Sequence, residues 1–231
     1  MLYEDEAVVV VNKPAGMLAV PIKGSAVPSA LSLMSEKLKA RQQQALVVHR
    51  IDRFASGILL FAKTRRDREA LVAQFLAHAP ERIYMAVVRG RLDAQAGTLV
   101  HYFRREGMFQ QLSSPKDPKA TRAELRYFAQ RQLADASLVR VELLTGLQNQ
   151  IRAQFAAVGH PLIGDRKYHG PEAEEALIDR VALHAAQLEF THPRSGKIVS
   201  VECAMPPDLK RLIQHLSRAK SGDVNREQRR R

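Results

Sequence analysis

One short segment of the chain gathers four titratable side chains, one of which is a carboxylate. Residues 49–57 read His-Arg-Ile-Asp-Arg-Phe-Ala-Ser-Gly, which places Asp52 between Arg50 and Arg53. Neighbouring guanidinium groups favour the ionised form of a partly exposed carboxyl group. An ionised aspartate held where buried elements meet can act as a nucleophile or as a general base. A solvated turn with ion pairs would explain the same residues, and this segment alone does not separate the two interpretations.

Apolar runs flank this segment on both sides and indicate the elements that would hold it. Residues 45–48 (Ala-Leu-Val-Val) precede the segment, and residues 58–62 (Ile-Leu-Leu-Phe-Ala) follow it. Short apolar runs of this length are typical of buried strands. We therefore expect Asp52 to lie in the connection between two buried strands.

The rest of the chain mixes strand patterns with amphipathic helix patterns. Strands are expected over residues 7–11, 82–88, 98–103, 108–112, 123–128, 137–143, 186–191 and 197–203. Helices are expected to begin at Pro28, Thr64, Leu147, Pro171 and Pro207. This order predicts one domain of the α/β (α+β) class over residues 1–216, with a central mixed, largely antiparallel sheet flanked by helices. Residues 217–231 carry six Lys or Arg and two acidic residues without an apolar pattern, which predicts a disordered basic tail.

Composition favours a globular protein with a polyanionic partner. The 231 residues include 36 Lys or Arg and 24 Asp or Glu, giving a net charge of +12. Such a charge indicates nucleic acid first and an anionic membrane surface second, and the lack of an amphipathic basic helix disfavours the membrane. A single cysteine, Cys203, and an acidic N-terminus unlike a signal peptide predict a cytoplasmic protein. We expect a monomer with no membrane span.

Three other chemistries find no support in the sequence. The histidines are scattered, without a His-Glu-x-x-His pattern or paired cysteines, so no metal site is expected. No glycine-rich phosphate loop precedes a helix, which disfavours nucleotide hydrolysis. Ser56 lacks the Gly-x-Ser-x-Gly context of a hydrolase nucleophile.

Two side chains elsewhere could complete a site around Asp52. Arg152 follows Ile151 at the edge of an apolar helix face, from which its guanidinium could reach a cleft and pair with a carboxylate. Tyr84 lies in the middle of a buried-looking strand, where a tyrosine is more often core than a stacking platform.

Five segments, in this order along the chain, resemble the RluA family of RNA pseudouridine synthases. They are residues 10–16 (Val-Val-Asn-Lys-Pro-Ala-Gly), residues 49–57, Tyr84, residues 145–152 (Thr-Gly-Leu-Gln-Asn-Gln-Ile-Arg) and residues 159–165 (Gly-His-Pro-Leu-Ile-Gly-Asp). Residues 183–185 and 190–193 add to the resemblance, which begins close enough to Met1 to imply a member without an N-terminal S4 RNA-binding domain. The resemblance implies a central mixed sheet crossed by an active-site cleft, and no cofactor.

The resemblance also implies roles for individual residues. Asp52 matches the catalytic aspartate, Arg152 the arginine that pairs with it, and Tyr84 the tyrosine that stacks on the target uracil. Arg50 matches the arginine that fills the gap left by the extruded nucleotide, since a uridine in a stem must be flipped out at a cost of a few kcal/mol. The remaining expected RNA contacts are Arg53, Lys13 and Ile151.

The helix that presents Arg152 departs from the family pattern. Leu147 and Asn149 stand where Arg and His are usual, and Gln154 stands where a His is usual. We expect Leu147 and Asn149 to remove polar support from this helix. The sequence therefore predicts either an RNA pseudouridine synthase acting on structured rRNA or tRNA, or a non-catalytic RNA-binding protein, such as a ribosome-assembly factor, on the same fold.

Overall fold

The computed structural model describes residues 1–24, 27–107, 109–168 and 178–228, with side chains described as far as residue 218. The chain forms two compact units, each built from two separate segments. Unit 1 comprises Met1–Ile83 and His184–Ala204, and unit 2 comprises Tyr84–Leu183 and Met205–Arg231. The single domain predicted over residues 1–216 stays a prediction.

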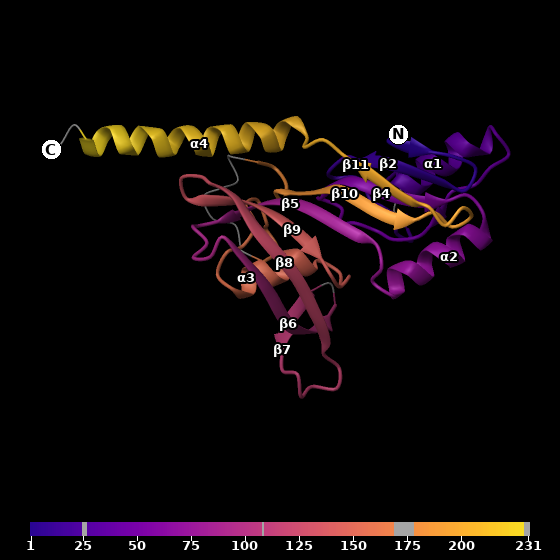
Figure 1. Ribbon diagram of the computed structural model, residues 1–231, viewed down its shortest axis with the longest axis horizontal. Coiled ribbons are helices and arrows are strands. Elements are labelled where there is room, and N and C mark those ends of the chain that lie inside the picture. Colours follow the sequence, from indigo (N-terminus) through magenta and orange to yellow (C-terminus); the bar gives the residue numbers. More distant parts are fainter. Residues whose placement is uncertain (25–26, 108, 169–177, 229–231) are drawn as a thin grey trace. The chain divides into compact units, whose positions relative to one another are not determined.

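Unit 1 is built on strands that, apart from Tyr3–Glu4, were expected from its apolar runs. Its strands are β1 (Tyr3–Glu4), β2 (Val8–Lys13), β3 (Leu46–Val47), β4 (Ser56–Ala62), β10 (Leu183–Thr191) and β11 (Ile198–Glu202). The central β4 pairs antiparallel with β2 and β3 and parallel with β10, and β10 pairs antiparallel with β11 (Figure 1). Every residue of β4 is buried, which explains why its sequence is almost uniformly apolar rather than alternating.

Two helices begin in unit 1 at capping residues. Helix α1 (Ala30–Lys39) begins after Ser29, whose side chain accepts a hydrogen bond from the Ser32 amide. Helix α2 (Arg65–Leu76) begins after Thr64, as predicted, and the Thr64 hydroxyl accepts from the Asp67 amide. Leu71 of this helix is buried, whereas Leu76 is 76% exposed.

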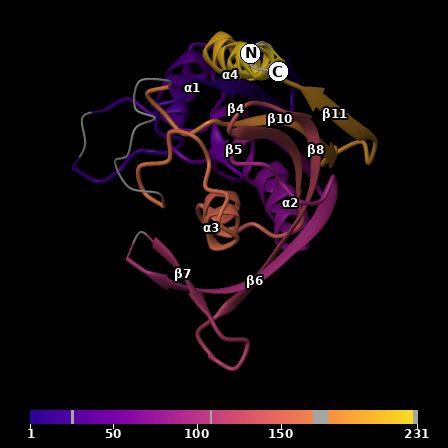
Figure 2. The same cartoon turned by 90° about the vertical axis from the view of Figure 1, so that its left-hand side faces the viewer.

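Unit 2 contains a run of antiparallel strands that bends around a short helix. Its strands are β5 (Glu81–Arg89), which begins in unit 1, β6 (Ala96–Glu106), β7 (Phe109–Ser113), β8 (Thr121–Gln132) and β9 (Ala136–Leu143), in the spatial order β5-β9-β8-β6-β7. Helix α3 (Gln150–Ala157) lies on the inner side of β6 and β7 (Figure 2). The helix begins three residues later than predicted, because Asn149 adopts a left-handed conformation with φ of 55°.

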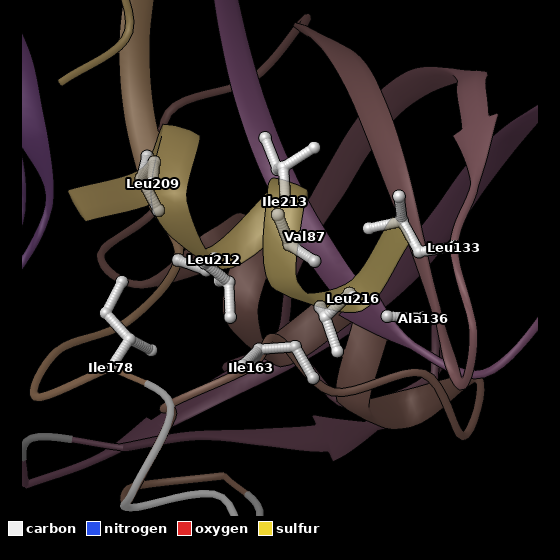
Figure 3. Close-up of a cluster of buried hydrophobic side chains, with 10 residues drawn as sticks. Val87, Leu133, Ala136, Ile163, Ile178, Leu209, Leu212, Ile213 and Leu216 are labelled. Atoms are coloured by element: carbon white, nitrogen blue, oxygen red, sulfur yellow. The ribbon is translucent and has the colours of Figure 1, made fainter. Parts of the chain in front are cut away.

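Helix α4 (Pro207–Gln228) begins at the predicted proline, and its first turns pack into the hydrophobic core of unit 2. Leu209, Leu212, Ile213 and Leu216 point toward a cluster that includes Val87 and Ile163, as Figure 3 shows. The helix then continues to Gln228, so the backbone of residues 217–228 is helical where the sequence predicts a disordered tail. Extending an existing helix fixes one residue per added hydrogen bond, and Ala, Lys, Arg, Glu and Gln all favour it.

The predicted fold class is confirmed, with mixed, mostly antiparallel strands and four helices in the described residues. No helix in this part of the chain is long and apolar enough to cross a membrane. The acidic helix predicted to begin at Pro171 falls on residues 171–177, which lie outside the described residues.

Candidate active site

Asp52 lies in the connection between β3 and β4, as the flanking apolar runs predict. The two strands pair antiparallel, with Leu46 opposite Ala62. Within the connection, the Ala55 amide donates to the Asp52 carbonyl at 3.2 Å. Asp52 is half-buried, whereas Arg50 and Arg53 are exposed. The loop between the paired strands therefore holds a half-buried carboxylate, and the two arginines beside it are exposed to solvent.

The Lys13 side chain binds the backbone of the Asp52 loop. The predicted contact of Lys13 with RNA needs correction. The side chain is only 1% exposed, and Nζ donates to the carbonyls of Pro14, Met17, Arg53 and Ala55 at 2.7–3.0 Å. A buried ammonium group is stable only when its protons are hydrogen-bonded. Lys13 therefore ties the turn after β2 to the Asp52 loop, and its charge does not face solvent.

A second set of hydrogen bonds joins the same turn to the Asp52 loop. The Gly16 amide donates to the Arg53 carbonyl, and Arg53 Nε donates to the Gly16 carbonyl, both at 2.9 Å. Gly16 has a φ of +84°, a backbone conformation that favours glycine. The Arg53 guanidinium also lies 5.2 Å from the centre of the Phe54 ring. Arg53 thus braces the loop while remaining exposed.

A half-buried histidine, His49, and a buried one, His184, support the strands on either side of Asp52, and reasoning from local patterns did not assign them this role. His49 Nε2 accepts from the Leu60 amide at 3.1 Å, and its ring stacks on Phe75 with centroids 4.5 Å apart. His184 Nδ1 lies 2.9 Å from Ser56 Oγ, and Nε2 lies 3.0 Å from the Cys203 carbonyl. Because a carbonyl only accepts, His184 Nε2 donates to the Cys203 carbonyl.

The close approach of β4 and β10 depends on a glycine at the end of the predicted active segment. Gly57 has a φ of +109°, and a Cβ atom built there would lie 2.2 Å from the Ala185 carbonyl oxygen. Any side chain at this position would therefore push the two parallel strands apart. The glycine that closes residues 49–57 is a packing requirement of the strand that follows Asp52.

In unit 2, Arg152 is held by a network that the sequence did not reveal. Its Nε and Nη2 donate to the two carboxylate oxygens of Asp165 at 2.7 and 2.6 Å. Its Nη1 donates to Asn149 Oδ1 at 3.0 Å, and the guanidinium lies 5.5 Å from the centre of the Tyr168 ring. The expectation that Asn149 removes polar support from this helix is wrong, because the amide oxygen binds Arg152 directly.

Gln154 also departs from the family pattern, and its side chain binds helix α3 to neighbouring strands. Its side chain is fully buried, and Nε2 donates to the carbonyls of Leu99 on β6 and Ala123 on β8 at 2.9 and 3.2 Å. Its Oε1 accepts from Gln150 Nε2 at 2.9 Å. Two glutamine amides therefore attach the helix that carries Arg152 to two strands of unit 2.

The remaining predicted site residues lie in the interior of unit 2. Tyr84 on β5 is 9% exposed, and Ile151 on α3 is 4% exposed. Asp52, Arg50, Arg53 and Lys13 thus lie in unit 1, and Tyr84, Ile151 and Arg152 lie in unit 2. Apart from the correction for Lys13, the roles predicted for these residues toward RNA stay predictions.

Comparison with known proteins adds independent findings. The family described as RNA pseudouridylate synthase matches residues 7–157. A ribosomal large subunit pseudouridine synthase D of Zymomonas mobilis is 36% identical over 228 residues, covering 94% of this chain and 72% of that protein. A ribosomal large subunit pseudouridine synthase C of Escherichia coli is 34% identical over 235 residues, covering 95% and 70%. The fold is similar to that of human RNA pseudouridylate synthase domain containing 4, with a TM-score of 0.77 at 19% identity over 93% of this chain and 92% of that one.

Proposed function

The chain belongs to the RNA pseudouridylate synthase family, and from that premise we propose that it isomerises specific uridines of structured ribosomal RNA to pseudouridine in the cytoplasm. The relatives named for the large ribosomal subunit support this substrate class over transfer RNA. The net charge of +12 supports a polyanionic partner, because Lys and Arg neutralise phosphates and release their counterions. The whole assignment is carried by one observation, the Asp52 carboxylate on a loop fixed by Lys13 and Gly16.

The proposed reaction exchanges one bond between uracil and ribose for another. The N1–C1′ bond breaks, the uracil rotates, C5 bonds to C1′, and the proton displaced from C5 is balanced by one gained at N1. Asp52 acts as the nucleophile or the base that begins this sequence. Attack on the sugar, attack on the base and proton removal from the sugar all place the same carboxylate against the substrate. A loop with fixed backbone hydrogen bonds favours each of these, because it holds the carboxylate in the reactive geometry.

The other residues act on the flipped nucleotide and on the carboxylate. Arg50 is exposed on the Asp52 loop, which suits a side chain that enters the duplex and fills the gap left by the uridine. Tyr84 supplies the ring that stacks on the uracil while it is detached, and Arg152 supplies the positive charge that pairs with Asp52. No cofactor takes part in this scheme.

The proposal is tested by mapping pseudouridine in ribosomal and transfer RNA from cells with and without the protein. At least one ribosomal site should disappear without it, and the purified protein should restore that site on a matching transcript. Asp52→Asn should abolish the modification and leave RNA binding intact, because only the reactive carboxylate changes. Asp93→Asn, at an exposed position, is the matched control and should keep full activity.

The alternative function makes the opposite prediction in the same experiments. A ribosome-assembly factor without catalysis would bind RNA, yet no pseudouridine would be lost on its deletion and no transcript would be modified by the wild-type protein. That result would refute the enzymatic proposal. If a pseudouridine disappears from transfer RNA alone, the proposed reaction would stand and the proposed substrate, ribosomal RNA, would be wrong.

A further inference from the structure

The Asp165 carboxylate of unit 2 accepts several hydrogen bonds. Its side chain is fully buried, and both oxygens accept from Arg152. Oδ1 also accepts from the backbone amides of Lys167 and Tyr168 at 2.9 and 3.2 Å. These amides fix the carboxylate in the loop, so the loop backbone determines where Asp165 presents its two oxygens.

The geometry of this pair fixes the orientation of the guanidinium. A planar guanidinium bound through two parallel N–H···O bonds can neither rotate nor shift without breaking both bonds. Asp165 binds the Nε–Nη2 edge, Asn149 binds Nη1, and Tyr168 lies 5.5 Å away across its ring. Arg152 is therefore held by three different side chains, although arginine is among the most flexible residues.

We propose that Asp165 is a positioning residue for catalysis, which holds the Arg152 guanidinium in one fixed orientation. This inference rests on the proposed function, since it requires Arg152 to take part in the reaction. Asp165 does not itself touch the RNA. Its effect should therefore appear in kcat rather than in KM.

A second two-pronged pair in the same unit joins a buried arginine to a partly exposed aspartate. Arg180 Nε and Nη2 donate to the two oxygens of Asp208 at 2.7 and 3.0 Å. This pair joins the segment before β10 to the first turn of α4, and Arg180 Nη1 donates to the carbonyls of Val181 and Leu183. Asp208→Asn is thus a control that changes the same kind of carboxylate on another element, α4.

The test is a double-mutant cycle on Asp165 and Arg152 with pseudouridine formation as the readout. Asp165→Asn should lower kcat about 100-fold with KM nearly unchanged, because a small displacement of a catalytic group can cost that much. Arg152→Lys keeps the charge and loses the two-pronged geometry. If Asp165 acts through Arg152, adding Asp165→Asn to Arg152→Lys should change kcat by no more than about twofold. Asp208→Asn should leave kcat within about twofold of the wild-type value.

Two further measurements keep the outcome decisive. Asp165→Glu retains the charge and displaces the carboxylate by one methylene, so a positioning role predicts a clear loss of kcat even if the Asn variant fails to fold. The Nε–H signal of Arg152 in nitrogen-edited NMR should be protected from exchange in the wild type and lose protection in Asp165→Asn. This signal reports on the Asp165–Arg152 pair and does not require enzymatic activity. If the wild type forms no pseudouridine, the proposed function is refuted, and the signal still shows whether Asp165 holds Arg152.

The positioning role is overturned by any of three results. Multiplicative effects of Asp165→Asn and Arg152→Lys would show that the two residues act independently. Full activity of Asp165→Glu would show that the charge alone matters. An unchanged Arg152 Nε–H signal in Asp165→Asn would show that the carboxylate does not hold the guanidinium.

Discussion

At the scale of single residues, the polar groups Lys13 and His49 beside the Asp52 loop are buried or half-buried, and each binds a specific partner. The Lys13 ammonium binds four carbonyls, and His49 accepts the Leu60 amide. Burying such groups costs free energy unless every donor and acceptor is paired. The benefit is a loop whose backbone cannot shift, which is what a reactive carboxylate requires.

The His49 environment makes stability depend on pH. Burial, together with the nearby Arg82 charge, lowers the pKa of His49 to about 3. An unfolded histidine has a pKa of about 6.5, so between these values the unfolded chain binds a proton that the folded protein excludes. Stability from neutral His49 is therefore complete above about pH 6.5 and is lost as the pH falls towards 3.

This dependence predicts a difference between the wild type and His49→Gln, which does not titrate. Between pH 8 and pH 5, the free energy of unfolding of the wild type should fall by about 2 kcal/mol more than that of the variant. Urea denaturation at the two pH values measures both changes. Burial also lowers the pKa of His101, but His101 titrates in both proteins and cancels in the comparison. Equal losses in both proteins would contradict the prediction.

At the scale of elements, α3 is unusual because its polar residues are buried along with its apolar ones. Gln150, Arg152 and Gln154 are all less than 9% exposed, as are Ile151 and Phe155. A helix of eight residues is too short to be stable alone, so its position depends on tertiary contacts. The two glutamines supply these contacts to β6 and β8, and Asn149 with Asp165 fixes the arginine between them.

Replacing Gln154 with Leu should therefore destabilise the protein. The substitution keeps the volume but leaves the buried carbonyls of Leu99 and Ala123 without this donor, which predicts a loss of about 2–3 kcal/mol in the free energy of unfolding. Chemical denaturation measures the loss. Gln111→Leu, at an exposed position of β7, is the control and should change stability by less than about 0.5 kcal/mol. An equally small effect at Gln154 would show that its amide is not an anchor.

At the scale of the whole molecule, the dominant property is positive charge. The chain carries 12 more Lys and Arg than Asp and Glu. Residues 219–231 carry five Lys or Arg and two acidic residues. Basic surfaces bind RNA largely by releasing counterions from phosphates. Affinity for RNA should thus depend strongly on salt, whereas the choice of uridine depends on the site.

Deleting residues 219–231 should flatten the salt dependence of RNA binding. Each removed contact between a cation and a phosphate should lower the slope of log K against log salt by about 0.7. Titrations of a structured ribosomal fragment at several salt concentrations measure the slope. The deletion keeps Leu209, Leu212, Ile213 and Leu216, so an unchanged unfolding curve is the control for the core. An identical slope in both proteins would exclude a contribution from this segment.

The sequence by itself determined most of the strands, the helix starts after Thr64 and at Pro207, and the loop that carries Asp52. These features follow from local patterns, since apolar runs and caps depend on neighbours along the chain. Only the tertiary structure decided what Lys13, Asn149 and Asp165 do. Each acts on a group brought to it by folding, such as the Arg53 carbonyl 40 residues from Lys13 or Arg152 13 residues before Asp165. Whether a charged side chain faces solvent or a buried partner depends on those long-range contacts, which local spacing does not encode.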